Sequence, residues 1–97
     1  FDFAARLVLA THPERDEAPP IVRSAVRFGA SPRAMQALIR AGRARALMAG
    51  RKHVSTDDIR AIAPLVLTHR VVLSFEAQLD RISAPDIVAA ILQNHRS

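Results

Sequence analysis

Three marked helix starts restrict the fold that this chain can adopt. The pattern Val-Ser-x-x-Asp-Ile at residues 54–59 is a capping box combined with a hydrophobic staple, and Ile-Ser-x-x-Asp-Ile at residues 82–87 repeats it. A third start is Ser31-Pro32, where a capping hydroxyl precedes a proline whose φ suits the first helical position. Helices bury their apolar faces against one another. The sequence therefore predicts an all-α fold, a small helical bundle.

The longest predicted helix runs from Ser31 to Gly50, where the glycine suits the residue that ends a helix. One side of it is apolar and built mainly of small residues: Ala34, Leu38, Ala41 and Met48, with Ala37 and Ala44 beside them. We expect another helix to pack close against that side. Another side gathers Arg33, Gln36, Arg40 and Arg43. Gly42 is interpreted as a weak point that the helix tolerates.

The remaining segments are shorter. Residues 1–10 are typical of the end of a helix and residues 11–20 of a loop. Residues 21–29 form either a short helix, which we favour, or an extended lead-in. The helix that starts at Ser55 is expected to end or kink at Pro64. Beyond Pro64 the sequence fits either a second short helix or a strand. One short strand or hairpin near residues 66–74 is therefore compatible with the predicted bundle.

The length and composition fit one small soluble domain. The chain has 97 residues, 49% of them hydrophobic, and we expect a single domain over residues 1–97. Because it opens on Phe1 rather than Met, we take it as excised from a longer protein. No apolar run approaches the roughly 20 residues of a membrane span. The absence of cysteine excludes disulfides and thiolate metal sites and suits the cytoplasm, where we expect the protein.

The charge is strongly positive and almost entirely due to arginine. Lysine and arginine total 14 against 9 aspartates and glutamates, for a net charge of +5, and Lys52 is the only lysine. Arginine favours bidentate contact with phosphate or carboxylate groups. The charge alone does not distinguish among nucleic acid, a nucleotide and an acidic protein as the binding partner.

Catalytic and metal-binding patterns are absent from the sequence. The histidines at positions 12, 53, 69 and 95 are scattered without metal-ligand spacing, and we interpret them as surface or helix-end residues. There is no phosphate-binding glycine loop and no nucleophile elbow. Asp57 and Asp58 could hold a hard cation, but their place in the first turn of a helix is explained by the helix dipole. We predict no metal site and no enzymatic activity for this chain alone.

Arg33 is the residue that most needs an explanation. A cation in the first turn of a helix is disfavoured by about 0.3–1 kcal/mol, because that end of the helix is already positive. Arg33 is either a solvated side chain or half of an anion site that it shares with the free N–H groups of the helix start. In the second case Ser31 and Pro32 form the start that presents it. Arg40 lies two turns further along the same face and could extend the contact.

Three motifs stand out between Phe28 and Ala77: "GASPRA" at residues 29–34, the pattern V-x-x-D-D-I-x-A-I-A-P-x-V-L from Val54, and His69-Arg70, for which we assign no role. With these motifs, the stretch from Phe28 to Ala77 resembles the C-terminal lid of MoxR-family AAA+ ATPases. Both ends of the chain match loosely, including "LATHPE" at residues 9–14.

The resemblance implies a role for Arg33. It would be the sensor-2 residue, which reaches the β- and γ-phosphates of ATP bound mainly by the large subdomain. The phosphate loop, the Mg²⁺-binding motif and the arginine finger of the family do not occur in these 97 residues. ATP and Mg²⁺ are thus expected in the full-length protein, and no cofactor in the fragment.

The resemblance also implies partners and a cellular role. The partners are the large AAA+ subdomain of the same chain, neighbouring subunits of a hexameric ring, and a von Willebrand factor A-domain protein, with no membrane or nucleic acid. The role is chaperone-like remodelling, or insertion of metals or cofactors. One alternative is a basic helical DNA-binding or histone-like dimerisation module, although aromatic residues for base stacking are scarce. Another is a helical interaction module without nucleotide contact.

Overall fold

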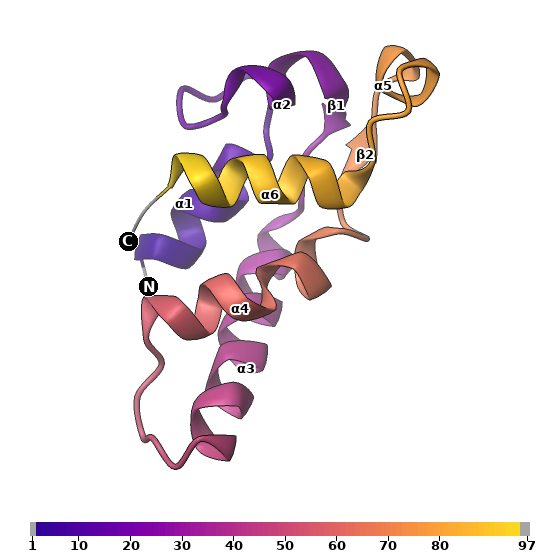
Figure 1. Cartoon of the computed structure of the whole chain (residues 1–97). Coiled ribbons are helices and arrows are strands. Elements are labelled where there is room, and N and C mark those ends of the chain that lie inside the picture. Colours follow the sequence, from indigo (N-terminus) through magenta and orange to yellow (C-terminus); the bar gives the residue numbers. More distant parts are fainter. Residues whose placement is uncertain (1, 96–97) are drawn as a thin grey trace.

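The computed structural model describes residues 2–95, which form helices and one two-stranded sheet (Figure 1). In chain order the elements are α1 (Asp2–Ala10), α2 (Pro20–Ala25), β1 (Val26–Phe28), α3 (Pro32–Met48), α4 (Thr56–Leu67), β2 (Val72–Leu73), α5 (Phe75–Leu79) and α6 (Ala84–Asn94). α1, α2 and α6 gather at one end of the molecule, while α3 and α4 extend away from them (Figure 1). The predicted small helical bundle is confirmed. No helix within residues 2–95 is long and apolar enough to cross a membrane.

α3 packs along α4 through a stripe of small side chains. The buried residues of α3 are Ala34, Leu38, Gly42 and Ala46, each four positions after the last. Met48, which we expected on the apolar side, is 90% exposed, so that part of the prediction is wrong. A Cβ on Gly42 would lie 2.8 Å from Ile59 Cδ1 and 3.0 Å from Val54 Cγ1. Gly42 is therefore a close-contact position between α3 and α4, and more than a tolerated weak point.

The two predicted capping boxes are confirmed. At the start of α4 the Ser55 hydroxyl accepts a hydrogen bond from the Asp58 N–H, and the Asp58 carboxylate accepts one from the Ser55 N–H. Ser83 and Asp86 repeat both bonds at the start of α6. Ser31 occupies the N-cap position of α3, but its side chain makes no cap hydrogen bond. The expected hydroxyl cap is thus wrong at Ser31, although the helix starts at Pro32 as predicted.

The two-stranded sheet joins distant parts of the chain. β2 lies inside the range predicted for a short strand, and it pairs antiparallel with β1, placing Val26 opposite Leu73 and Phe28 opposite Val72. Residues 21–29 thus contain both of the structures we considered, a short helix followed by an extended segment.

α4 does not end at Pro64. It continues to Leu67, where the Thr68 hydroxyl donates a hydrogen bond to the Pro64 carbonyl. The short helix α5, which follows β2, was not predicted from the sequence.

Candidate functional site

The start of α3 presents an unpaired cation to solvent. Ser31, Pro32 and Arg33 are all exposed. Within residues 2–95 the Arg33 guanidinium makes no hydrogen bond and no ion pair. The Ser31 side chain does not cap the helix, and Pro32 has no N–H of its own. Because the Ala34 N–H already donates to the Ser31 carbonyl at 2.9 Å, the Arg33 guanidinium is the main group of this turn that is open to an acceptor from outside the chain.

The electrostatics of this helix start differ from those of α4 and α6. α4 begins with Asp57 and Asp58 and α6 with Asp86, so each has a carboxylate near its positive end. α3 has no acidic residue in its first turn and carries Arg33 there instead. Helix dipole and guanidinium add up to a positive potential, which is the arrangement that binds phosphate or carboxylate groups.

Two side chains that follow α1 fix the approach to this helix start. The Ala30 N–H donates a hydrogen bond to Thr11 Oγ1 at 2.9 Å, and His12 Nε2 lies 2.8 Å from the Ala30 carbonyl oxygen. Because a carbonyl only accepts, His12 carries a proton on Nε2 in this contact. Thr11 is completely buried, and its own hydroxyl donates to the Val8 carbonyl at 2.6 Å. Both polar backbone groups of Ala30 are thus held by the loop after α1.

Gly29 allows the loop after α1, which carries Thr11 and His12, to come close to the segment before α3. A Cβ at that position would lie 2.7 Å from the Thr11 carbonyl oxygen and 2.8 Å from His12 Cγ. The glycine of the GASPRA stretch is therefore required by a backbone approach from a distant segment. Sequence reasoning placed His12 among the scattered histidines and passed over Thr11. The loose match of "LATHPE" was the one signal that could have pointed to them.

An apolar hollow of about 280 Å³ adjoins the helix start. It lies between α1 and the first turn of α3 and is lined by Ala5, Val8, Leu9, His12, Pro32 and Met35. The free cation at Arg33 thus follows directly on a proline that lines an apolar depression. Such a combination suits contact with a second surface that carries an anion.

The other residues predicted to share a polar face of α3 with Arg33 are also exposed. Gln36, Arg40 and Arg43 all face solvent. Arg40 lies seven residues after Arg33, about 10 Å further along the helix axis at 1.5 Å per residue. An anion at Arg33 must therefore be extended to reach Arg40 as well.

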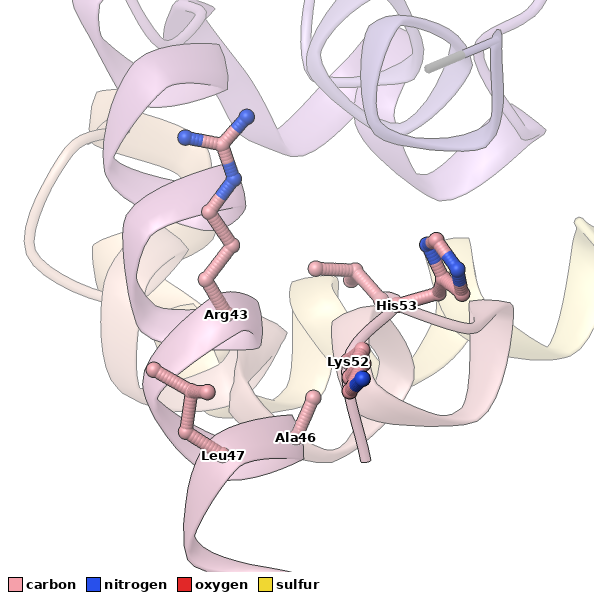
Figure 2. Close-up of a pocket in the computed structure, with 6 residues that line it drawn as sticks. Arg43, Ala46, Leu47, Lys52 and His53 are labelled. Carbon is pink, nitrogen blue, oxygen red and sulfur yellow. The ribbon is translucent and has the colours of Figure 1, made fainter. Parts of the chain in front are cut away.

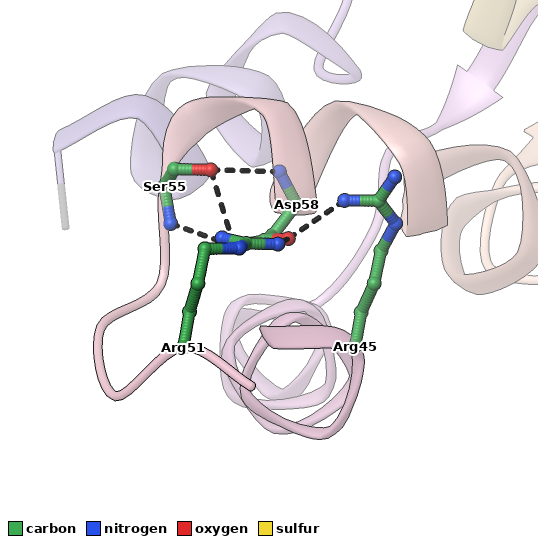
Figure 3. Close-up of polar contacts among 4 residues, drawn as sticks. All are labelled: Arg45, Arg51, Ser55 and Asp58. Carbon is green, nitrogen blue, oxygen red and sulfur yellow. Dashed lines mark hydrogen bonds and ion pairs between the residues drawn. The ribbon is translucent and has the colours of Figure 1, made fainter. Parts of the chain in front are cut away.

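Asp58 is not available to a metal ion. It is completely buried, and its carboxylate accepts hydrogen bonds from Arg51 Nη1 at 2.6 Å and Arg45 Nη1 at 2.7 Å, and from the Ser55 N–H at 2.9 Å (Figure 3). The Arg51 guanidinium, the Ser55 N–H and then Arg45 hold the pKa of the Asp58 carboxyl well below its usual range. In the part of the chain that the structure describes, no group of three His, Cys, Asp or Glu residues could hold a metal.

The remaining histidines do not gather at this helix start. His69 and Arg70 are exposed in the turn after α4. His95 Nε2 lies 2.8 Å from the Glu17 carbonyl oxygen, which ties the end of α6 to the loop before α2.

Comparison with known proteins identifies the domain. The family model described as the AAA lid domain matches residues 18–91. The chain belongs to the AAA lid domain family. This lid is of the MoxR type, as its motifs indicated: it is 40% identical over 92 residues to the chaperone MoxR1 of Mycobacterium tuberculosis and 41% identical over 69 residues to the protein MoxR of Methylorubrum extorquens. Those alignments cover 95% and 70% of the lid.

A solved structure shows the same fold. The lid superposes with a TM-score of 0.91 and 32% identity on the crystal structure of a protein assigned as an ATPase from Cytophaga hutchinsonii, over 98% of the lid. The lid spans 29% of that chain, and 24% and 20% of the two MoxR proteins. It thus corresponds to between a fifth and a third of the length of these relatives.

Proposed function

We propose that this lid belongs to a longer AAA+ ATPase and that Arg33 is its sensor-2 residue. In this role the guanidinium contacts the phosphates of ATP held with Mg²⁺ by the large subdomain of the same chain. The observation that carries the proposal is the unpaired Arg33 at an uncapped, positive helix start. The cation is unfavourable there without an anion and favourable with one.

The chemistry of phosphoryl transfer explains why such a residue is useful. Negative charge spreads over the oxygens of the transferred group, and a guanidinium placed beforehand stabilises it without rearrangement. Thr11 and His12 hold the backbone of Ala30 just before the helix, so the helix start that carries Arg33 is fixed before nucleotide binds. The same contacts join Arg33 to α1, so a change in nucleotide state at Arg33 moves the lid as a body.

The rest of the proposed function concerns the full-length protein. The lid, residues 1–97, is one domain of a cytoplasmic ATPase, and the fragment alone does not hydrolyse ATP. The apolar hollow beside Pro32 suits a contact with the large subdomain. The protein works as a hexameric ring with a von Willebrand factor A-domain partner, in chaperone-like remodelling or in insertion of metals or cofactors. The printed name of one relative, chaperone MoxR1, supports the chaperone role.

The test compares Arg33→Ala with Arg23→Ala in the full-length protein. Arg23 is an exposed arginine of α2 whose guanidinium, among the described residues 2–95, donates only to the Arg15 carbonyl, at 3.4 Å. Loss of a positioned charge donor lowers turnover by about a hundredfold, so we expect that loss of kcat for Arg33→Ala and none for Arg23→Ala. If Arg33→Ala changes neither ATP turnover nor nucleotide affinity, the sensor role is wrong.

A further inference from the structure

A second surface lies at the C-terminal end of α3, away from Arg33. A pocket of about 230 Å³ opens there between the last turns of α3 and the loop that leads to α4 (Figure 2). It is lined by Arg43, Ala46, Leu47, Lys52, His53 and Val54. Small-molecule sites usually enclose about 300–1,000 Å³. This pocket is smaller, and its size suits one inserted side chain better than a cofactor.

The floor and one wall of the pocket are apolar. Ala46 is buried, whereas the neighbouring Leu47 and Met48 are 70% and 90% exposed. Of these two exposed side chains, Leu47 lines the pocket, and it supplies apolar area for contact with an inserted side chain.

The rim of the pocket is basic. Arg43 stands on the α3 side and His53 on the loop side, with open space between them (Figure 2). No carboxylate lines the pocket, and Arg43 and Lys52 form no ion pair with residues 2–95. The buried carboxylate of Asp58 is already neutralised by Arg45 and Arg51. The positive charge of the rim is therefore uncompensated.

The loop that carries Lys52 and His53 is held in place. Its preceding residue, Arg51, donates its backbone N–H to the Ala46 carbonyl at 2.8 Å and its guanidinium to Asp58. Asp58 also accepts from Ser55 at the other end of the same loop (Figure 3). The loop is thus clamped at both ends against α3 and α4. A binding surface that is ordered beforehand loses less entropy when a partner docks.

We propose that this pocket docks an acidic segment of a partner protein. The segment inserts one aliphatic side chain between Leu47 and Val54 and places carboxylates against Arg43 and Lys52. The guanidinium of Arg43 can hold a carboxylate through two parallel hydrogen bonds. Nucleic acid fits less well, because no Phe, Tyr or Trp lines the pocket and the imidazole of His53 is its single ring for stacking a base. This docking role is separate from phosphate sensing at Arg33 and does not depend on it.

The experiment measures binding of labelled probes to the full chain by fluorescence anisotropy. The first probe is a peptide with one leucine flanked on each side by glutamates. The second has serine in place of the leucine, the third has glutamines in place of the glutamates, and the fourth is a single-stranded oligonucleotide of matching charge. The protein variants are Arg43→Ala with Lys52→Ala, and Arg23→Glu as the control, since both changes lower the net charge from +5 to +3. Circular dichroism checks that each variant keeps its helices.

We expect the first peptide to bind, and each of the other peptides to bind about tenfold more weakly. The pocket variant weakens binding of the first peptide by about tenfold or more, beyond the loss seen for Arg23→Glu. No binding of the first peptide overturns the proposal, and so does equal binding by the pocket variant and the control. Equal binding of the serine peptide means attraction by charge alone, and tighter binding of the oligonucleotide means a nucleic-acid surface. Both of these results also contradict it.

Discussion

The buried hydroxyl of Thr11 accepts a hydrogen bond from the Ala30 N–H at 2.9 Å, and so links the end of α1 to the start of α3. The two residues are 19 positions apart in the chain. Since Ala30 lies three residues before Arg33, the direction in which α3 starts depends on this bond. The position of the exposed cation is thus decided by a residue that is itself hidden from solvent.

Replacing Thr11 by valine tests the strength of this link. The variant keeps the shape of the side chain but leaves the buried Ala30 N–H without its acceptor, which costs about 1–3 kcal/mol of stability. Urea unfolding of the lid measures the loss. Thr68→Val is the matched control, because that hydroxyl donates to Pro64 at an exposed position and changes stability by no more than about 0.5 kcal/mol. Equal losses in the two variants would contradict the assigned role of Thr11.

Two glycine substitutions separate a backbone clash from a side-chain contact. In Gly29→Ala the new Cβ meets the Thr11 carbonyl oxygen at 2.7 Å, and a backbone atom cannot easily move away. We expect a loss of about 1–3 kcal/mol. In Gly42→Ala the nearest atom is the flexible end of Ile59, and alanine regains up to about 1 kcal/mol of helix propensity.

Gly29→Ala is therefore the more damaging of the two. Thermal unfolding of both variants under the same buffer conditions shows which substitution causes the larger loss of stability. A larger loss for Gly42→Ala would mean that the α3–α4 contact is tighter than the contact of the loop with Gly29.

Asp58 gives the stability of the lid a defined dependence on acid pH. Its pKa is lowered in the folded state, so the ionised carboxylate favours folding above the unfolded pKa of about 3.9. This contribution is complete at neutral pH and is lost as the pH falls from about 4 towards the folded pKa. Asp58→Asn leaves Arg45 and Arg51 without their acceptor charge, and since both are partly exposed we expect a loss of about 2 kcal/mol at pH 7.

The measurement is the free energy of unfolding between pH 7 and pH 3. The difference between wild type and Asp58→Asn shrinks towards the acid end of this range. Asp57→Asn serves as the control, since Asp57 is exposed in the same helical turn and interacts mainly with the helix dipole. A constant difference across the range would show that the charge of Asp58 is not the source of the effect.

His12 is expected to act on nucleotide through Arg33. In the full-length ATPase, His12→Ala removes the contact with the Ala30 carbonyl and loosens the start of α3. Turnover falls less than in Arg33→Ala, because the guanidinium is still present. In the double variant the His12 change adds little, since a positioning residue has nothing left to position. Fully additive losses of kcat would show that His12 acts independently of Arg33.

The local features of the fold could be predicted from the sequence. The capping boxes at Ser55 and Ser83 depend on hydrogen bonds across three residues, so the residues that make them stand together in the chain. The start of α3 at Pro32 was predicted for the same reason. At Ser31 the same local pattern failed in part, because the backbone has the extended conformation of an N-cap residue but the hydroxyl makes no cap bond.

Features that depend on distant segments could not be predicted in this way. Helical spacing placed Met48 on the buried side, but the buried stripe of α3 ends at Ala46 and Met48 is exposed. The pairing of β1 with β2 joins segments that carry too few residues to show a strand pattern of their own. The roles of Gly29 and Gly42 are defined by atoms of Thr11 and Ile59, which spacing along the chain does not place.

The sequence by itself determined where the capped helices begin, the bias of the charge towards arginine, and the presence of Arg33 in the first turn of a helix. Only the tertiary structure decided that Arg33 has no partner within residues 2–95, that Asp58 is buried between two arginines, and that Thr11 and His12 hold the residue before the helix. The physical reason is the separation along the chain over which each interaction acts. Helix caps and dipoles act within one turn, whereas burial and pairing of a side chain depend on segments that only folding brings together.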